Sequence, residues 1–223
     1  MKKSVKVVLT SSLALSTIFS STYIGSSHYV KAEQAVPVQV TSGETINEMD
    51  RMIDSFKEYL AGGETINQSS LLDSKINNVH RTAEIRLSGF LPENERNNAL
   101  FDGVILGENE GNLSNSFRNL YDIALATKSY KKESLSGANL YENKDAITKV
   151  IDGLEWLYTN FYENQDTGYY GNWYAWEIGM PMHITKTLLL LEKEINQQNP
   201  ELIQNYVTSM DQYLRKGKNG DID

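Results

Sequence analysis

The chain has 223 residues, with 21 lysines and arginines against 29 aspartates and glutamates, a formal charge of −8 at pH 7, and no cysteine. Without cysteine it forms no disulfide and no zinc site that needs a thiolate, so its stability must come from a hydrophobic core, for which one domain of this length is sufficient. The acidic balance argues against nucleic acid as a partner, because neutralising phosphates needs a face rich in lysine and arginine.

Residues 1–32 have the pattern of a secretory signal peptide. Three lysines precede an apolar stretch over Val7–Phe19, and Val30-Lys31-Ala32 supplies a small-residue cleavage site before Glu33. Serines and threonines interrupt the apolar stretch, which falls short of the ~20 residues needed to span a bilayer. We therefore expect a secreted, extracellular product without stable membrane insertion. Cleavage removes four lysines, which leaves 17 basic and 29 acidic residues and a formal charge of −12.

Helical periodicity dominates the rest of the chain. Residues 33–44 show no periodicity and are expected to form a flexible leader, whereas residues 45–215 carry apolar side chains three and four positions apart. This spacing predicts six helices, over Thr45–Leu60, Ser69–Leu87, Ser114–Thr127, Asn143–Tyr162, Pro181–Gln197 and Leu202–Leu214. No alternating strand pattern is found, so the predicted fold is all-α and built from helical hairpins, followed by a tail over residues 216–223.

The loop between the second and third predicted helices is long. It covers Ser88–Asn112, is rich in Gly, Asn and Glu, and is expected to contain one short helical turn around Arg96–Phe101. Loops of this length inside a compact domain are often functional. Ser114 or Asn112 is expected to cap the helix that follows.

The stretch Asn172-Trp173-Tyr174-Ala175-Trp176-Glu177-Ile178-Gly179-Met180-Pro181 concentrates aromatic side chains at a predicted helix entrance. Aromatic faces suit sugars, because a pyranose ring has a flat patch of C–H groups on one side and hydroxyls around its edge. Trp173 and Tyr174 would then form a platform, and Asn172 would offer both a donor and an acceptor. The alternative is that the rings fill the core between helices. Composition does not choose between the two.

Three segments of the chain carry a family pattern. The first is Gly171–Pro181 followed by Thr187–Leu191, the second is Leu113–Ala126, and the third is Ile147–Asn160 with Leu154-Glu155-Trp156-Leu157-Tyr158 at its centre. Together they resemble polysaccharide lyase family 8, the hyaluronate, chondroitin AC and xanthan lyases, which typically carry Asn-Trp-Trp and then Glu-Ile-Gly-x-Pro. Order and spacing also match, over roughly residues 45 to 200.

The chain departs from the family pattern at three positions. Tyr174 replaces the usual second tryptophan, Ala175 replaces a polar residue, and Met182 stands where many hyaluronate lyases have Arg or Lys. These departures leave the choice among hyaluronan, chondroitin and xanthan open. Met182 slightly favours a xanthan-type enzyme.

The resemblance implies a fold and a reaction. Such lyases arrange helical hairpins as an incomplete α/α toroid, of which six helices make about half. They cleave next to a uronic acid by β-elimination: an Asn neutralises the carboxylate, a base removes the C5 proton, and an acid protonates the leaving oxygen. The family's Asn, His and Tyr in those roles are not matched in this sequence, whereas its aromatic patch is matched by Trp173 and Tyr174, with Asn172 beside them.

Our leading interpretation is therefore the N-terminal α-domain of a secreted polysaccharide lyase, inactive by itself, with an anionic polysaccharide as partner. The rivals are a xanthan-type lyase domain, a non-catalytic truncated protein that binds carbohydrate, and a helical interaction module whose aromatics are all core. Because the chain is acidic, either the rest of a longer protein supplies basic side chains, or the local placement of Arg81, Arg86 and Arg118 matters more than the total.

Other chemistry-bearing residues are expected to be structural. His80 and His183 lack a partner at ligand spacing, and a lone His80 on a helix is expected to be partly buried or on the surface. Glu177 suits a capping or network role, since no second carboxylate lies at the spacing of a hydrolase. The loop Asn164–Gly168 resembles a calcium loop but lacks the terminal glutamate. No metal and no cofactor are expected.

Overall fold

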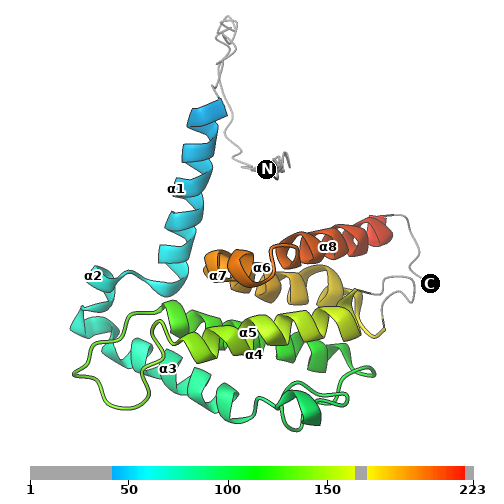
Figure 1. The fold of residues 1–223 in the computed structure, drawn as a ribbon, viewed down its shortest axis with the longest axis horizontal. Helices are drawn as coiled ribbons and strands as arrows, with labels where there is room; N and C mark the ends of the chain where they lie inside the picture. Colours follow the sequence, from blue (N-terminus) through cyan, green and yellow to red (C-terminus); the bar gives the residue numbers. More distant parts are fainter. Residues whose placement is uncertain (1–41, 164–169, 219–223) are drawn as a thin grey trace, which may run out of the picture. The chain divides into compact units, whose positions relative to one another are not determined.

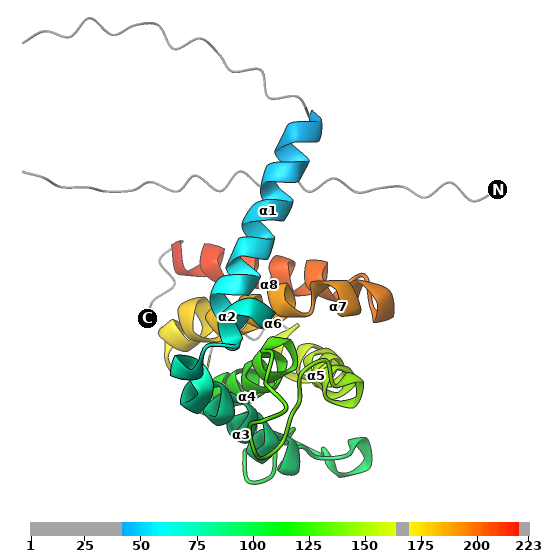
Figure 2. The same ribbon diagram turned by 90° about the vertical axis from the view of Figure 1, so that its left-hand side faces the viewer.

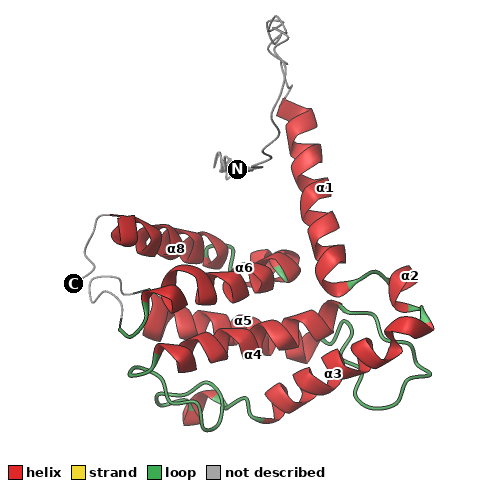
Figure 3. Ribbon diagram, turned by 180° about the vertical axis from the view of Figure 1, so that it is seen from behind, coloured by secondary structure: helices red, strands yellow, loops and turns green. Residues whose placement is uncertain are grey.

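A computed structural model describes residues 42–163 and 170–218. Within these ranges the chain forms helices and loops and no named β-strand, only one isolated bridge between Phe90 and Phe101 (Figure 1, Figure 3). The prediction of an all-α fold is confirmed. The signal peptide, most of the leader, the calcium-like loop and the end of the tail lie outside the described residues.

The first helix, α1 (Ser42–Ala61), begins three residues before its predicted start and ends one residue after its predicted end at Leu60. Gly62 has φ +70°, a conformation that favours glycine, and the Asn67 side chain packs directly against it. Asn67 lies at the end of the short helix α2 (Glu64–Asn67) and donates from Nδ2 to the carbonyl of Ala61 at 3.0 Å. This hydrogen bond holds the chain at the point where it leaves α1.

The apolar face of α1 is largely exposed, which periodicity alone did not predict. Only the C-terminal end, at Leu60 and Ala61, joins the core. The exposed side chains are Met49, Met52, Phe56 and Tyr59, with 41–83% of their surface accessible. An apolar groove between α1 and the helix α6 is lined on the α1 side by Met52, Ile53 and Phe56.

The next three helices form the base of the domain. A 3₁₀ turn over Ser70–Leu72 precedes α3 (Asp73–Ser88), so the regular helix begins four residues after the predicted start at Ser69. It is followed by α4 (Glu110–Lys128) and α5 (Lys144–Leu157). Asn109, rather than Ser114 or Asn112, caps α4, since its Oδ1 accepts from the backbone N–H of Gly111 at 2.7 Å.

The long loop before α4 is ordered by one arginine. Arg96 is buried, donates from Nε to the carbonyl of Leu91 at 3.0 Å and from Nη2 to Asp152 at 2.5 Å, and lies 5.0 Å from the centre of the Phe90 ring. The helical turn in this loop is a 3₁₀ turn at Glu93–Glu95, before the predicted Arg96–Phe101. Arg96 thus ties the start of the loop, at Phe90 and Leu91, to Asp152 on the helix α5.

His80 is fully buried, which corrects the expectation of a partly buried or surface position. Its Nε2 lies 2.9 Å from the carbonyl of Ser129, and its Nδ1 accepts from the backbone N–H of Leu140 at 3.1 Å. These two bonds require a neutral ring that donates from Nε2. Burial, the largest cause, lowers the pKa of His80 below 6.5. Its role is to hold the loop between α4 and α5.

The remaining elements are two π-helical turns, η3 (Tyr158–Tyr162) and η4 (Ala175–Gly179), and the helices α6 (Met180–Leu190), α7 (Glu192–Gln198) and α8 (Leu202–Lys218). Figure 2 shows α6 between α8 and α4. The segment that leads into α6 runs in the same direction as α4. Gly171 packs beside Glu110 at the start of α4, and Gly179, just before α6, packs beside Ser114 one turn further along α4. The core between them holds a cluster of buried rings: Phe117, Tyr162, Trp176, Tyr206 and Tyr213.

Candidate functional site

Trp173 and Tyr174 lie on the surface at the entrance of η4. Their exposed fractions are 49% and 53%, so neither ring is part of the core. The ring centres are 6.0 Å apart with an angle of 73° between the planes. This edge-to-face arrangement forms a corner rather than a flat platform, with one ring as a floor and the other as a wall.

Trp176, only three residues further on, has the opposite environment. It is 2% exposed, stacks on Tyr162 at 6.0 Å with an interplanar angle of 12°, and contacts Tyr213 at 5.1 Å. Its Nε1–H donates to the backbone carbonyl of Tyr170 at 2.9 Å. Trp176 therefore fills the core, whereas Trp173 and Tyr174 are exposed, and their binding of a sugar stays a prediction.

Asn172 organises the backbone at this corner. Its Oδ1 accepts from the backbone N–H of Tyr174 at 2.9 Å, and its own carbonyl accepts from the N–H of Ala175 at 3.1 Å. The side chain thus caps the turn that presents the two rings. Asn172 is itself exposed, and among the described residues its Nδ2 has no hydrogen-bond partner, which leaves two N–H donors directed away from the backbone it caps.

Gly171 determines how closely the corner approaches α4. It has φ +72°, and a Cβ built at this position would collide with the carboxylate of Glu110. Only glycine satisfies both the backbone conformation and the close contact. Glu110 and Gly171 are far apart in sequence, so inspection of the aromatic stretch did not identify Glu110 as a residue that positions the site.

The turn η4 explains the different environments of the two tryptophans. A π-helical turn inserts an extra residue into the helix and shifts the side chains that precede it around the helix axis. Trp173 and Trp176 are three residues apart and would share a face in a regular α-helix, but here one is exposed and the other buried. Such turns occur frequently at functional sites.

Two further findings concern metal and membrane. In residues 42–163 and 170–218, no group of three or more His, Cys, Asp or Glu side chains is placed to hold a metal ion. Across the same residues, every helix is too short or too polar to cross a bilayer.

The model of polysaccharide lyase family 8, N-terminal alpha-helical domain, matches residues 57–220. The chain belongs to this family. It is 30% identical over 98 residues to hyaluronate lyase HylB of Enterococcus faecalis (strain ATCC 700802 / V583), and 35% identical over 60 residues to xanthan lyase of Bacillus sp. (strain GL1). These alignments cover 44% and 27% of this chain but only 9% and 6% of the relatives.

Solved structures of family 8 lyases share the fold. Paenibacillus xanthan lyase superimposes with a TM-score of 0.63 at 28% identity, over 74% of this chain and 15% of that one. Streptomyces coelicolor A3 chondroitin AC lyase, in complex with chondroitin sulphate, superimposes with a TM-score of 0.63 at 15% identity, over 79% of this chain and 22% of that one. The family 8 resemblance and the prediction of helical hairpins that form part of an α/α toroid are thus confirmed. The chain spans less than a quarter of each of these family 8 proteins.

Proposed function

We propose that this family 8 domain serves a secreted polysaccharide lyase that cleaves hyaluronan or a related uronic-acid polymer by β-elimination, and that it seats the polymer on Asn172, Trp173 and Tyr174. The observation that carries the proposal is the exposure of both rings in the segment that matches the family pattern. Exposed tyrosine and tryptophan side chains that lie together are typical of a binding surface.

The corner geometry suits a pyranose ring. The sugar's C–H face would lie on one aromatic plane, while the perpendicular ring limits its position from the side. The Asn172 Nδ2 would donate to a hydroxyl or ring substituent at the edge of the sugar. Two rings and one amide would select a sugar by its shape. Which polymer is bound would then depend on contacts with other residues.

We further propose that the isolated chain binds the polymer without cleaving it. β-Elimination needs a base for the C5 proton, an acid for the leaving oxygen and a donor that neutralises the carboxylate. His80 is buried with both ring nitrogens engaged, so it is not able to take this role. The catalytic groups would then come from residues outside this sequence, in line with the small share of each relative that the chain covers.

The test is a binding titration with defined oligosaccharides of hyaluronan, chondroitin and xanthan, followed by calorimetry and by tryptophan fluorescence. Trp173→Ala and Tyr174→Ala should each weaken binding about 10-fold or more, since a stacked ring contributes about 1–3 kcal/mol. Tyr59→Ala is the matched control, because Tyr59 is an exposed aromatic on α1. Equal losses in Tyr59→Ala and Trp173→Ala would contradict the proposal.

The same titration separates a xanthan-type domain from a hyaluronan-type domain. Met182 is 46% exposed on α6 and presents an apolar surface where a basic residue would attract a carboxylate. A preference for xanthan over hyaluronan oligosaccharides, lost in Met182→Arg, would favour the xanthan-type assignment. Ultraviolet absorbance of the unsaturated uronide, compared with a boiled control, tests the proposed absence of cleavage by the isolated chain.

A further inference from the structure

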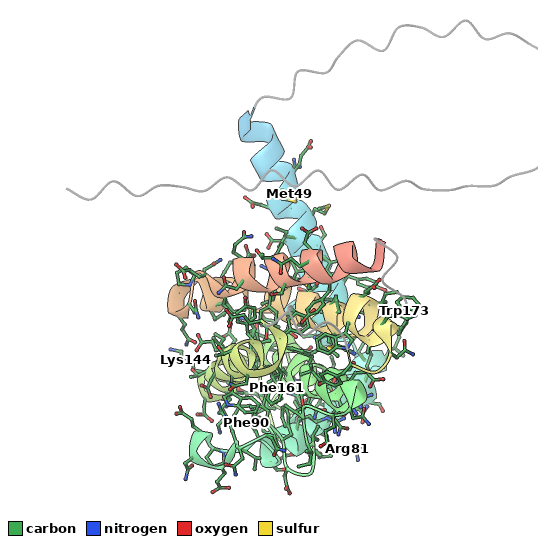
Figure 4. The ribbon with its side chains drawn as sticks, turned by 90° about the vertical axis from the view of Figure 1, so that its right-hand side faces the viewer. Met49, Arg81, Phe90, Lys144, Phe161 and Trp173 are labelled. Carbon is green, nitrogen blue, oxygen red and sulfur yellow. The ribbon has the colours of Figure 1, made fainter. Side chains whose placement is uncertain are left out.

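Four exposed apolar side chains follow one another along α1. Met49, Met52, Phe56 and Tyr59 have 41–83% of their surface accessible, and we call them the α1 stripe. They are spaced by three, four and three residues, so they lie along one face of the helix. Figure 4 shows Met49 on the part of α1 that projects beyond the other helices. An amphipathic helix gains most of its stability from packing, so this face is suited to a partner.

An apolar groove of about 590 Å³ lies directly beside the α1 stripe. Its walls are α1, η4 and α6, and every residue that lines it is apolar except Glu177, Thr185 and Lys186. A smaller groove of about 190 Å³ adjoins it on the side of α8, since the two share Ile53 and Leu189. We call the larger one the α1–α6 groove. The chain thus carries an apolar helix and an apolar receptor surface side by side.

We infer that two copies of this chain associate through these surfaces, with their α1 helices antiparallel and each α1 stripe packed into the α1–α6 groove of the other copy. A two-fold axis satisfies both surfaces on both copies at once. The spacing of the stripe reads the same in both directions. Antiparallel pairing then places Met49 opposite Tyr59 of the partner subunit, and one turn further Met52 opposite Phe56 of the partner subunit. This orientation also opposes the two helix dipoles.

The area involved is close to what a stable dimer needs. Each copy would cover the four side chains of the α1 stripe together with Ile178 and Met182, which are 44% and 46% exposed. With roughly 200 Å² for a side chain of this size, the exposed parts amount to roughly 650 Å² per copy, against about 600–1,000 Å² per partner in specific interfaces. Met52 and Met182 both line the groove, and flexible thioether side chains fill the irregular gaps of such an interface.

The charges around these surfaces determine how salt acts on the dimer. Five acidic and two basic residues give α1 a formal charge of −3, so two copies of this helix repel each other. The groove itself adds one charge of each sign, Glu177 and Lys186. Apolar burial would therefore drive association while electrostatic repulsion opposes it. Because salt screens this repulsion, dimerisation should become stronger as the salt concentration rises.

The first test measures the mass of the full chain by sedimentation velocity, over a range of protein concentrations and at low and high salt. The mass should rise toward twice that of one chain, and further at high salt. Met52→Lys puts a charge into the interface twice and should weaken dimerisation at least about 10-fold. Ile85→Lys is the matched control, because Ile85 on α3 is 58% exposed and Met52 is 61% exposed. It should dimerise like wild type, and urea unfolding should show that both variants stay folded.

The second test reads the orientation of the two helices. The chain has no cysteine, so a cysteine introduced on α1 is the single thiol. An oxidised mixture of Met49→Cys and Tyr59→Cys chains should form the mixed disulfide dimer, because these positions face each other in an antiparallel pair. Each variant alone should stay unlinked, since equivalent positions would lie roughly 15 Å apart along the helices. Linking of Met49→Cys to itself would show a parallel pair and contradict the arrangement.

Two further results would overturn the inference. A chain that stays monomeric at every concentration and salt condition would leave the groove to a different occupant, such as a helix of a larger protein. A dimer that Met52→Lys and Ile85→Lys weaken equally would have its interface elsewhere. Neither experiment contains a sugar, so the dimer is tested independently of the proposed function, and the failure of one leaves the other standing.

Discussion

The contrast between Trp173 and Trp176 gives a quantitative test of the aromatic stretch. Both are tryptophans, three residues apart, and the structure assigns one to the surface and one to the core. Replacing each by alanine in turn removes the same group of atoms from two environments. The difference in the free energy of unfolding therefore measures the environment alone.

For Trp176→Ala the structure predicts a large loss. The ring is 2% exposed and contacts three other rings, those of Tyr162, Tyr170 and Tyr213. Truncating a buried tryptophan costs about 3–5 kcal/mol. The lost hydrogen bond also leaves the Tyr170 carbonyl unpaired, which adds about 1 kcal/mol or more. Since domains of this kind are stable by about 5–15 kcal/mol, Trp176→Ala should lose a large share of its free energy of unfolding.

For Trp173→Ala the expected loss is about 1–2 kcal/mol, because half of the side chain is already in contact with water. Urea unfolding followed by circular dichroism measures both variants, and a slope of about 1–3 kcal/mol per molar urea places the Trp173→Ala midpoint about 0.3–2 M below that of wild type. If Trp173→Ala destabilises as much as Trp176→Ala, its ring is core, and the sugar-binding corner is refuted whatever the binding data show.

Three further predictions concern backbone and pH. Gly153→Ala in α5 should destabilise by about 1–3 kcal/mol despite better helix propensity, because the new Cβ would lie 2.8 Å from buried Leu120; thermal unfolding measures this, and a higher melting temperature would contradict it. Lowering the pH through 6.5 should reduce stability, because the unfolded chain binds a proton that buried His80 resists; urea unfolding at several pH values should show a weaker pH dependence in His80→Gln, and an equal dependence would contradict the assignment. Gly171→Ala should reduce oligosaccharide affinity, whereas Gly103→Ala, with a similar φ of +73° and open space around it, should show only the cost of backbone strain; equal affinities in a titration would contradict this.

Helix positions could largely be predicted from the sequence, since apolar spacing and turn residues are local signals. α1 ends just before Gly62, where a glycine is expected to stop a helix, and α5 begins just after Asn143, which caps it. The cap of α4 was misplaced by several residues because Asn109, Asn112 and Ser114 are all capping residue types, and only the hydrogen bond that Asn109 accepts distinguishes them. Boundaries depend on single bonds, whereas the existence of a helix depends on many residues.

The candidate site could be predicted from the sequence only in part. The sequence identified Asn172, Trp173 and Tyr174 but did not separate them from Trp176, because a π-helical turn changes which positions share a face. The fit of Glu110 against Gly171 joins the start of α4 to the segment before η4, so it depends on the packing of two parts of the chain that are 61 residues apart. Such contacts leave no local pattern in the sequence.

The net charge of the chain is a poor guide to its partner, because most of the interaction is local. Exposed charges further apart than the Debye length, about 8–10 Å at physiological salt, are largely screened from each other. Several carboxylates of this domain are already paired with lysine, as in Lys57–Glu192, Lys128–Glu194 and Lys132–Asp73. Raising the salt concentration should therefore weaken binding of uronate oligosaccharides to the wild-type chain, since the attraction would come from a few nearby cations. Stronger binding at high salt would instead mean that repulsion from the acidic surface dominates.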